Sequence, residues 1–136
     1  MHATAVAIEG TAILLRGPSG AGKSDLALRL INEGARLVAD DQAELRRTED
    51  QIVVSAPATI AGLIEVRGIG IVQVVPVAMA PLALLVDLVP SAEIERLPKA
   101  RFEEILGLPV PLIALAPFEA SAAAKLRFAC RAFPVR

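Results

Sequence analysis

The sequence predicts an α/β fold: a mixed sheet, a helix that follows a glycine-rich loop, and a second helix at the carboxyl end. Short apolar runs rich in Val, Ile and Leu recur along the chain, as is typical of buried strands. A glycine-rich loop joins the second run to an amphipathic segment, as at a strand-to-helix turn. At 136 residues the chain has the length of one domain, and we expect a single domain over residues 1–136.

Strands are expected where a short, apolar and partly β-branched run is bounded by turn residues. A hairpin is predicted from Leu45 to Ser55, because Glu49 and Asp50 provide its turn. Residues 64–75 carry two glycines, Gly68 and Gly70, which are followed by a Val-rich strand. The remaining predicted strands cover residues 4–8, 12–16, 36–39, 82–89 and 111–116.

An amphipathic helix is expected to begin near Lys23, and Gly34 stands where glycine commonly ends a helix. A second helix is expected over residues 119–133. Residues 57–63 are predicted to form a short helix or a loop. Residues 90–108 are the most polar part of the chain, and we expect an exposed segment with a short helix there.

Composition excludes several classes of function. The net charge is -1 and aromatic residues make up 3%, with no Trp or Tyr, so neither a basic field nor stacking platforms favour nucleic acid. Residues 71–89 are apolar but include Pro76, Pro81 and Asp87. That content argues against a membrane span and favours a pair of buried strands. The single cysteine, Cys130, is expected in the core, and the setting in the cytoplasm.

The glycine-rich loop has the pattern Gly-x-x-x-x-Gly-Lys-Ser of a P-loop, which binds the phosphates of ATP or GTP. Glycines let the backbone approach phosphate oxygens, and the helix that follows adds its positive end. Lys23 would reach the β- and γ-phosphates, and the hydroxyl of Ser24 would bind Mg²⁺. The predicted loop consists of Gly17, Pro18, Ser19, Gly20, Ala21, Gly22, Lys23 and Ser24.

Two acidic positions could serve the metal ion or the nucleophile. Asp40 and Asp41 follow a predicted strand, and Asp87 ends another apolar run. Adjacent acids repel each other unless a cation or hydrogen bonds compensate, yet all three also fit solvated turns. Glu65 and Arg67 lie two apart on one strand face, which fits either a site or a surface ion pair. His2 is the only histidine, and by position alone it fits a disordered terminus.

Several separated motifs together resemble one family. The chain looks like the catalytic domain of HPr kinase/phosphorylase, which phosphorylates a serine of the phosphocarrier protein HPr. The matching stretches are His2, fifteen residues before the loop, GPSGAGKSDLALRLI at residues 17–31, RLVADD at 36–41 and IEVRGIGIVQV at 64–74. The likeness is good to about residue 75 and weaker beyond, and it is greatest to the short proteobacterial form without the family's amino-terminal domain.

This resemblance implies a P-loop kinase-like fold, ATP and Mg²⁺ as cofactors, HPr as the protein substrate and a homo-oligomer, a hexamer in the family. It implies that His2 is an active-site residue and that one of Asp40 and Asp41 is the general base. It further implies that Glu65 is a magnesium ligand, and it makes Arg96 a candidate catalytic arginine. Asp87 matches no functional position of the family.

The likeness fails at the family's late Gly-Arg-Asn loop, where this chain has residues 116–121, APFEAS. The reverse phosphorolysis is therefore not implied. Two other functions stay open from the residues: a small-molecule P-loop kinase or hydrolase, and a non-catalytic nucleotide sensor in regulation of the phosphotransferase system.

Overall fold

A computed structural model describes residues 1–132 of the chain. The helices are α1 (Lys23–Asn32) and α2 (Ala122–Ala132), with short 3₁₀ turns η1 (Ala58–Ile60) and η2 (Ser91–Glu93). The strands are β1 (Thr4–Ile8), β2 (Thr11–Arg16), β3 (Arg36–Ala39), β4 (Glu44–Thr48), β5 (Gln51–Ser55), β6 (Leu63–Val66), β7 (Gly70–Gln73), β8 (Met79–Leu88), β9 (Arg101–Ile105) and β10 (Leu108–Leu115).

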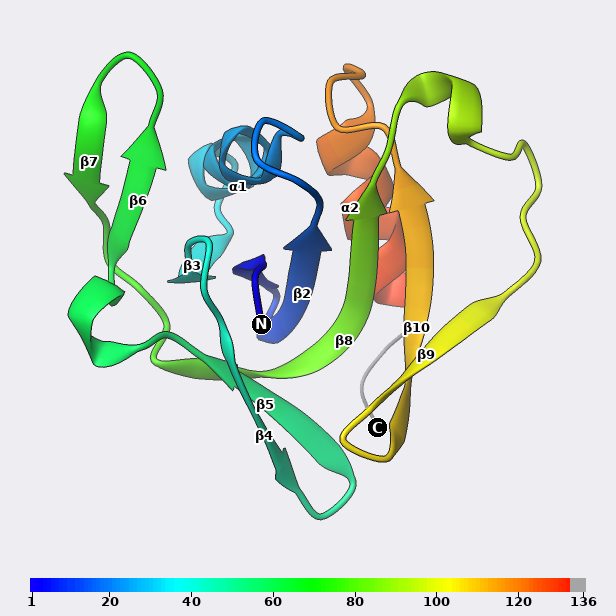
Figure 1. The fold of residues 1–136 in the computed structure, drawn as a ribbon, viewed down its shortest axis with the longest axis horizontal. Coiled ribbons are helices and arrows are strands. Elements are labelled where there is room, and N and C mark those ends of the chain that lie inside the picture. Colours follow the sequence, from blue (N-terminus) through cyan, green and yellow to red (C-terminus); the bar gives the residue numbers. More distant parts are fainter. Residues whose placement is uncertain (133–136) are drawn as a thin grey trace.

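The main sheet is mixed, with the strand order β3-β1-β2-β8-β10-β9. Strand β1 is antiparallel to both β2 and β3, so β2 and β3 run in the same direction. Strands β8 and β10 run parallel to β2 as well. The carboxyl ends of β2, β3, β8 and β10 and the start of β1 therefore share one edge of the sheet (Figure 1).

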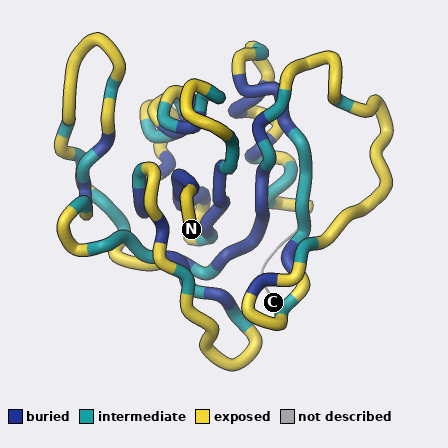
Figure 2. The backbone as a smooth tube through the Cα atoms, in the orientation of Figure 1, coloured by how far each residue is buried: buried dark blue, intermediate teal, exposed yellow. Residues whose placement is uncertain are grey.

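Both faces of the sheet are covered, and the side chains alternate between them along each strand. On β2, Ile13 and Leu15 pack with α1 and α2 in one buried cluster, whereas Leu14 lies in a second cluster with Val54 of β5. The central strands are accordingly the most deeply buried part of the chain (Figure 2). Each fully buried Leu or Ile contributes about 1.5–3 kcal/mol to folding, so this double-sided core fixes the edge on which the loops sit.

Helix α1 ends as the sequence predicts. Gly34 has a φ of 108°, and its N–H donates to the carbonyl of Ile31. The N–H of Ala35 then reaches back to the carbonyl of Leu30, which completes the double hydrogen bond of a Schellman motif. Because this stop is tight, the chain turns straight into β3.

The α/β class, both helices and most strands are confirmed, but three expectations were wrong. The polar segment 90–108 contains η2 and also an unexpected strand, β9. The apolar pattern did not predict β9 because this strand is rich in charged residues, which an edge strand can carry on a face exposed to water. Strand β7 is largely exposed and pairs only with β6, so residues 71–89 are not a buried pair of strands. Strands β8 and β10 start at Met79 and Leu108, each three residues before the expected position.

Helix α2 starts at Ala122, and residues 119–121 form the turn before it. The last residue predicted for this helix, Phe133, lies outside the described residues. Cys130 is half-buried against the helix-side cluster, and burial raises the pKa of its thiol to about 11. Among the described residues, no helix has the length and apolar character that crossing a membrane requires.

Candidate active site

The glycine-rich loop connects β2 to α1 at the shared edge of the sheet. Gly20 and Gly22 have φ values of 83° and 105°, which residues with a Cβ rarely adopt. Gly22 is the N-cap of α1, and within the described residues no side chain caps it. The first N–H groups of the helix are therefore available to an anion, next to the positive end of the helix dipole.

Lys23 is only 6% exposed, and its ammonium lies against the backbone of the loop. Its Nζ donates to the carbonyls of Gly17 at 2.6 Å and Pro18 at 3.2 Å. A buried ammonium is costly unless it is well hydrogen-bonded. The loop therefore holds one positive charge at its centre, on the side where the sheet ends.

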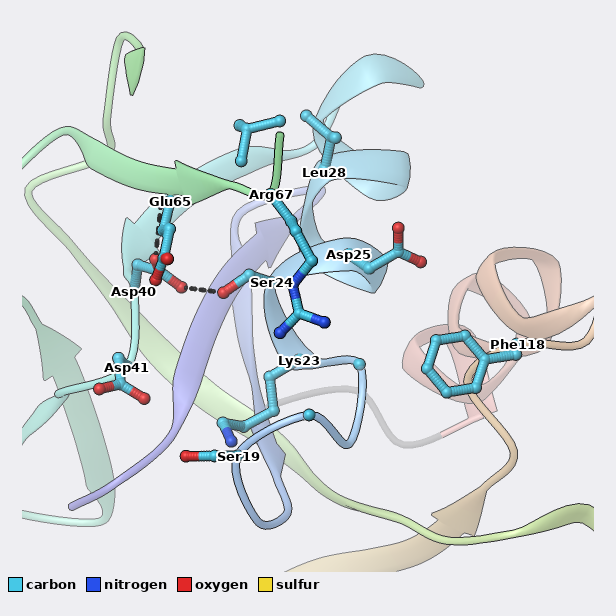
Figure 3. A pocket seen from close by; sticks show the side chains of 13 residues that line it. Ser19, Lys23, Ser24, Asp25, Leu28, Asp40, Asp41, Glu65, Arg67 and Phe118 are labelled. Atoms are coloured by element: carbon cyan, nitrogen blue, oxygen red, sulfur yellow. Dashed lines mark hydrogen bonds between the residues drawn. The ribbon is translucent and has the colours of Figure 1, made fainter. Parts of the chain in front are cut away.

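Asp40 directly follows β3 and accepts three hydrogen bonds. Its Oδ1 accepts from the hydroxyl of Ser24 at 2.7 Å and from that of Thr4 at 3.1 Å. Its Oδ2 accepts from the backbone N–H of Glu65 at 3.0 Å. The carboxylate thus ties together α1, β1 and the β6–β7 hairpin, and it lies directly beside the hydroxyl at the end of the P-loop (Figure 3).

Asp41 points away from Asp40 because the backbone between them turns sharply. Its φ is 68°, and the N–H of Gln42 donates to the carbonyl of Asp40 at 2.8 Å, which is the pattern of a rare and strained γ-turn. The Oδ1 of Asp41 is 2.7 Å from Nε2 of His2. The backbone N–H of Asp41 donates to the hydroxyl of Thr4 at 3.1 Å. Strain of this kind concentrates at functional sites.

These groups line a pocket of about 540 Å³, within the range of small-molecule sites. Arg67 projects from the β6–β7 hairpin into the pocket, toward the start of α1 (Figure 3). Phe118, in the loop between β10 and α2, closes the side opposite Asp40. The lining residues are Ser19, Gly20, Gly22, Lys23, Ser24, Asp25, Leu28, Asp40, Asp41, Glu65, Val66, Arg67 and Phe118.

Asp87 belongs to a separate cluster of ion pairs. Arg16 at the end of β2 donates through Nε to Asp87 at 2.8 Å and binds Glu103 of β9 in a bidentate manner, at 2.7 and 2.9 Å. The hydrogen bond from Arg16 lowers the pKa of Glu103, and the same bond is the main reason why the pKa of Arg16 is raised. Asp87 therefore joins β2 to β8 and does not line the pocket.

Most residues predicted for the site come together at this edge. Ser24, Asp40, Asp41 and Glu65 line the pocket with the loop, and His2 lies one hydrogen bond away. Arg96 does not join them, because it lies in the exposed stretch between η2 and β9. Within the described residues, Glu65 and Arg67 form no ion pair with each other, although their spacing also allowed that interpretation.

Sequence reasoning missed Thr4, whose hydroxyl holds both acids although it is fully buried. The available signal was a polar residue in an otherwise apolar run. In the sequence, Arg67 shares a strand face with Glu65 and lies in the matching stretch 64–74, but neither feature indicates that it enters the pocket. Phe118 gave no local signal, because its role depends on which loop meets the P-loop.

The polar groups of the pocket fit a nucleoside triphosphate with Mg²⁺. Uncapped N–H groups and Lys23 suit phosphate oxygens, and the oxygens of Ser24 and Asp40 are the hard ligands that Mg²⁺ prefers. The described residues contain no cluster of three or more His, Cys, Asp or Glu that could hold a metal by itself. Mg²⁺ is usually held by one or two carboxylates together with substrate phosphates, and a site of that kind does not require such a cluster.

The fold and the pocket define a P-loop kinase-like α/β protein. Comparison with known proteins narrows this class. The chain belongs to the family of the HPr serine kinase C-terminal domain, whose family model matches residues 1–125.

Similar proteins include the HPr kinase/phosphorylases of Exiguobacterium sp. (strain ATCC BAA-1283 / AT1b), 53% identical over 75 residues, and of Clostridium tetani, 45% identical over 74. Each match covers 54% of this chain and 24% of the relative, so this chain corresponds to a minor part of those proteins. The solved structure of the Hpr(Ser) kinase/phosphatase from Coxiella burnetii is similar over 97% of this chain and 93% of that one, with a TM-score of 0.86 and 30% identity.

Proposed function

We propose that this chain is an ATP- and Mg²⁺-dependent kinase that phosphorylates a serine of HPr. Membership of the HPr serine kinase C-terminal domain family supports the proposal, as do the names of its relatives. The observation on which it rests is the division of the acid pair: Asp40 bonds to the P-loop hydroxyl of Ser24, whereas Asp41 faces outward beside His2. A site of this kind needs one acid for the metal and one for the acceptor.

Asp40 is suited to the metal side of the site. Its carboxylate lies 2.7 Å from Ser24, so both groups could bind one Mg²⁺. Glu65, also on the pocket wall, is the proposed further ligand from the hairpin. When bound, Mg²⁺ neutralises charge on the β- and γ-phosphates. Lys23 would exchange its loop carbonyls for phosphate oxygens, because an ionised acceptor is the stronger partner.

Asp41 is suited to the acceptor side. Its side chain is 62% exposed, so a serine of a docked protein can reach it. As the serine oxygen forms its bond to phosphorus, the hydroxyl proton passes to the Asp41 carboxylate, and the bond between the γ-phosphorus and the ADP oxygen breaks. The hydrogen bond from His2 fixes the orientation of the carboxylate. Arg67, which lines the pocket, would stabilise the charge of the transferring group, rather than Arg96, which does not line it.

The direct test is incubation of the purified chain with γ-labelled ATP, Mg²⁺ and HPr. Labelled phosphoserine on HPr is the expected result. HPr as the substrate would also place the protein in the cytoplasm. Label that reaches small metabolites but never HPr would identify a small-molecule kinase. Nucleotide binding without any turnover would identify a sensor. Adding phosphate to purified phosphoserine-HPr then measures the reverse reaction separately.

Single substitutions separate the two acids. Asp41→Asn keeps the size of the side chain, and asparagine tolerates a positive φ, so the fold should persist. We expect loss of transfer to HPr of at least about 100-fold, the lower bound for general-base catalysis, with ATP affinity retained. Asp40→Asn should instead weaken Mg²⁺-dependent ATP binding. Full activity of Asp41→Asn would rule out its assignment as the base.

A further inference from the structure

Phe118 is a large apolar side chain held at the surface. It is 70% exposed, yet it meets the P-loop directly: a Cβ added to Gly22 would lie 3.0 Å from the Phe118 Cζ and 3.2 Å from the Pro117 Cγ. Among residues 1–132 it is the only aromatic residue that lines the pocket, in a chain with four Phe and no Trp or Tyr. The ring therefore gains little from burial, and its position needs another explanation.

The loop that bears this ring is anchored. The guanidinium of Arg29 on α1 donates to the carbonyl of Pro117 and pairs with Asp25 at 3.1 Å. Pro117 itself is buried, and its ring fixes the backbone φ just before Phe118. The aromatic ring is thus exposed but positioned in advance, which lowers the entropy lost when a ligand contacts it.

The position of Phe118 matches one end of a nucleotide. Asp40 and Ser24 mark the metal and γ-phosphate side of the loop, and Phe118 faces the pocket from the opposite side (Figure 3). Its loop follows β10, which runs parallel to β2 and β8. Ligands of open α/β sheets bind outside these carboxyl ends. A triphosphate that runs along the loop from Ser24 would bring its nucleoside to this ring.

We propose that Phe118 is the stacking platform for the adenine base of ATP; the inference rests on the proposed nucleotide-binding function. The face of the ring offers stacking, and the exposed apolar side chain of Leu28 adds an apolar wall to the same pocket. Stacking of a base on an aromatic ring changes affinity by roughly 5- to 150-fold. The phosphates contact other residues, so this effect should depend on the base alone.

Calorimetric titration with two ligands tests the proposal. We expect Phe118→Ala to bind Mg²⁺-ATP roughly 5- to 150-fold more weakly and to bind Mg²⁺-tripolyphosphate, which has no base, as the wild type does. Phe128 on α2 is the matched control, because it is 69% exposed and lies away from the pocket lining. Phe128→Ala should bind both ligands normally. Equal weakening of both ligands by Phe118→Ala, or no weakening, would overturn the proposal.

A spectroscopic measurement provides an independent readout. The chain has no Trp, so Phe118→Trp introduces a single reporter at the proposed contact. ATP should quench its fluorescence and tripolyphosphate should not. An unchanged signal with saturating ATP would count against stacking. So would an increased KM for HPr in Phe118→Ala with unaltered ATP affinity, because the ring would then contact the protein substrate.

Failure of the proposed function is distinguishable from failure of this inference. If Phe118→Ala selectively weakens ATP but the chain never labels HPr, the base platform stands and the kinase assignment falls. If HPr is labelled normally and Phe118→Ala binds ATP like the wild type, only the platform falls.

Discussion

Replacing Thr4 by valine would test whether one buried hydroxyl organises the acid pair. Valine has nearly the shape of threonine, so the fully buried site of Thr4 keeps its packing and gains no cavity. The change removes the donor to Asp40 Oδ1 and the acceptor for the Asp41 N–H, both at 3.1 Å. Two interactions are lost without a change in volume.

The expected cost follows from these partners. A hydrogen bond to a charged group contributes about 1.5–3 kcal/mol, and a neutral one about 0.5–1.5 kcal/mol. Asp40 is half-buried and Asp41 exposed, so water can partly replace both bonds, and the lower values apply. We expect the free energy of unfolding to fall by about 2 kcal/mol, well within the usual 5–15 kcal/mol of a domain. The variant should therefore fold.

Urea denaturation of the wild type, Thr4→Val and Thr11→Val measures this cost. Thr11 is the matched control, because its hydroxyl makes one neutral hydrogen bond, to the Ile8 carbonyl at 3.2 Å, at the opposite end of the same hairpin. Thr11→Val should cost less than Thr4→Val and leave HPr phosphorylation unchanged. Thr4→Val should also slow transfer, because both acids lose a fixed partner. A Thr4→Val variant as stable and active as Thr11→Val would refute the reasoning.

Three further outcomes are expected. Lys23→Met retains the packed stem but removes the charge, so calorimetry should record ATP affinity reduced roughly 10- to 100-fold, with little change in urea stability. Gly22→Ala should weaken ATP binding more than Gly20→Ala, because its Cβ would lie 3.0 Å from the Phe118 Cζ and 3.2 Å from the Pro117 Cγ and so displace the loop beside the pocket, whereas a Cβ on Gly20 meets no atom within 4 Å; similar binding by both would contradict this reasoning. The hydrogen bond from Arg16 lowers the pKa of Glu103 below its ordinary value in the folded state, so their pairing stabilises the fold above that ordinary value and its contribution is lost as the pH falls through the lowered pKa. Urea titrations at descending pH should therefore show a shallower loss in Arg16→Met than in the wild type; identical slopes would refute this linkage.

The sequence predicted those features that depend on neighbouring residues. The P-loop, the helix after it and the stop at Gly34 follow from local backbone requirements, and the structure has all of them. The approach of Asp40 to Ser24 also depends on the strand order. An antiparallel strand, β1, separates β2 from β3, so β2 and β3 run in the same direction and Asp40 comes to the edge that carries the P-loop.

Features set by register or by contacts between distant loops could not be predicted. Thr4 supports the acids only because β1 pairs with β3 in a register that places it beside Asp40. Strand β9 exists because β10 offers it a partner and Arg16 a counter-charge for Glu103. Likewise, nothing near Phe118 in the sequence indicates that its loop meets Gly22. Such contacts depend on tertiary structure, which periodicity does not encode.

The reversed direction of β1 has a consequence for the candidate site. Because this strand starts at the edge of the sheet that carries the P-loop, its first residues are fastened there: the Met1 amino group donates to the Ala43 carbonyl at 2.8 Å, and the Ala43 N–H donates to the Met1 carbonyl. These two hydrogen bonds lie beside the contact between His2 and Asp41, which is 2.7 Å long. The segment that carries His2 and the segment that carries Asp41 are therefore held together independently of their two side chains.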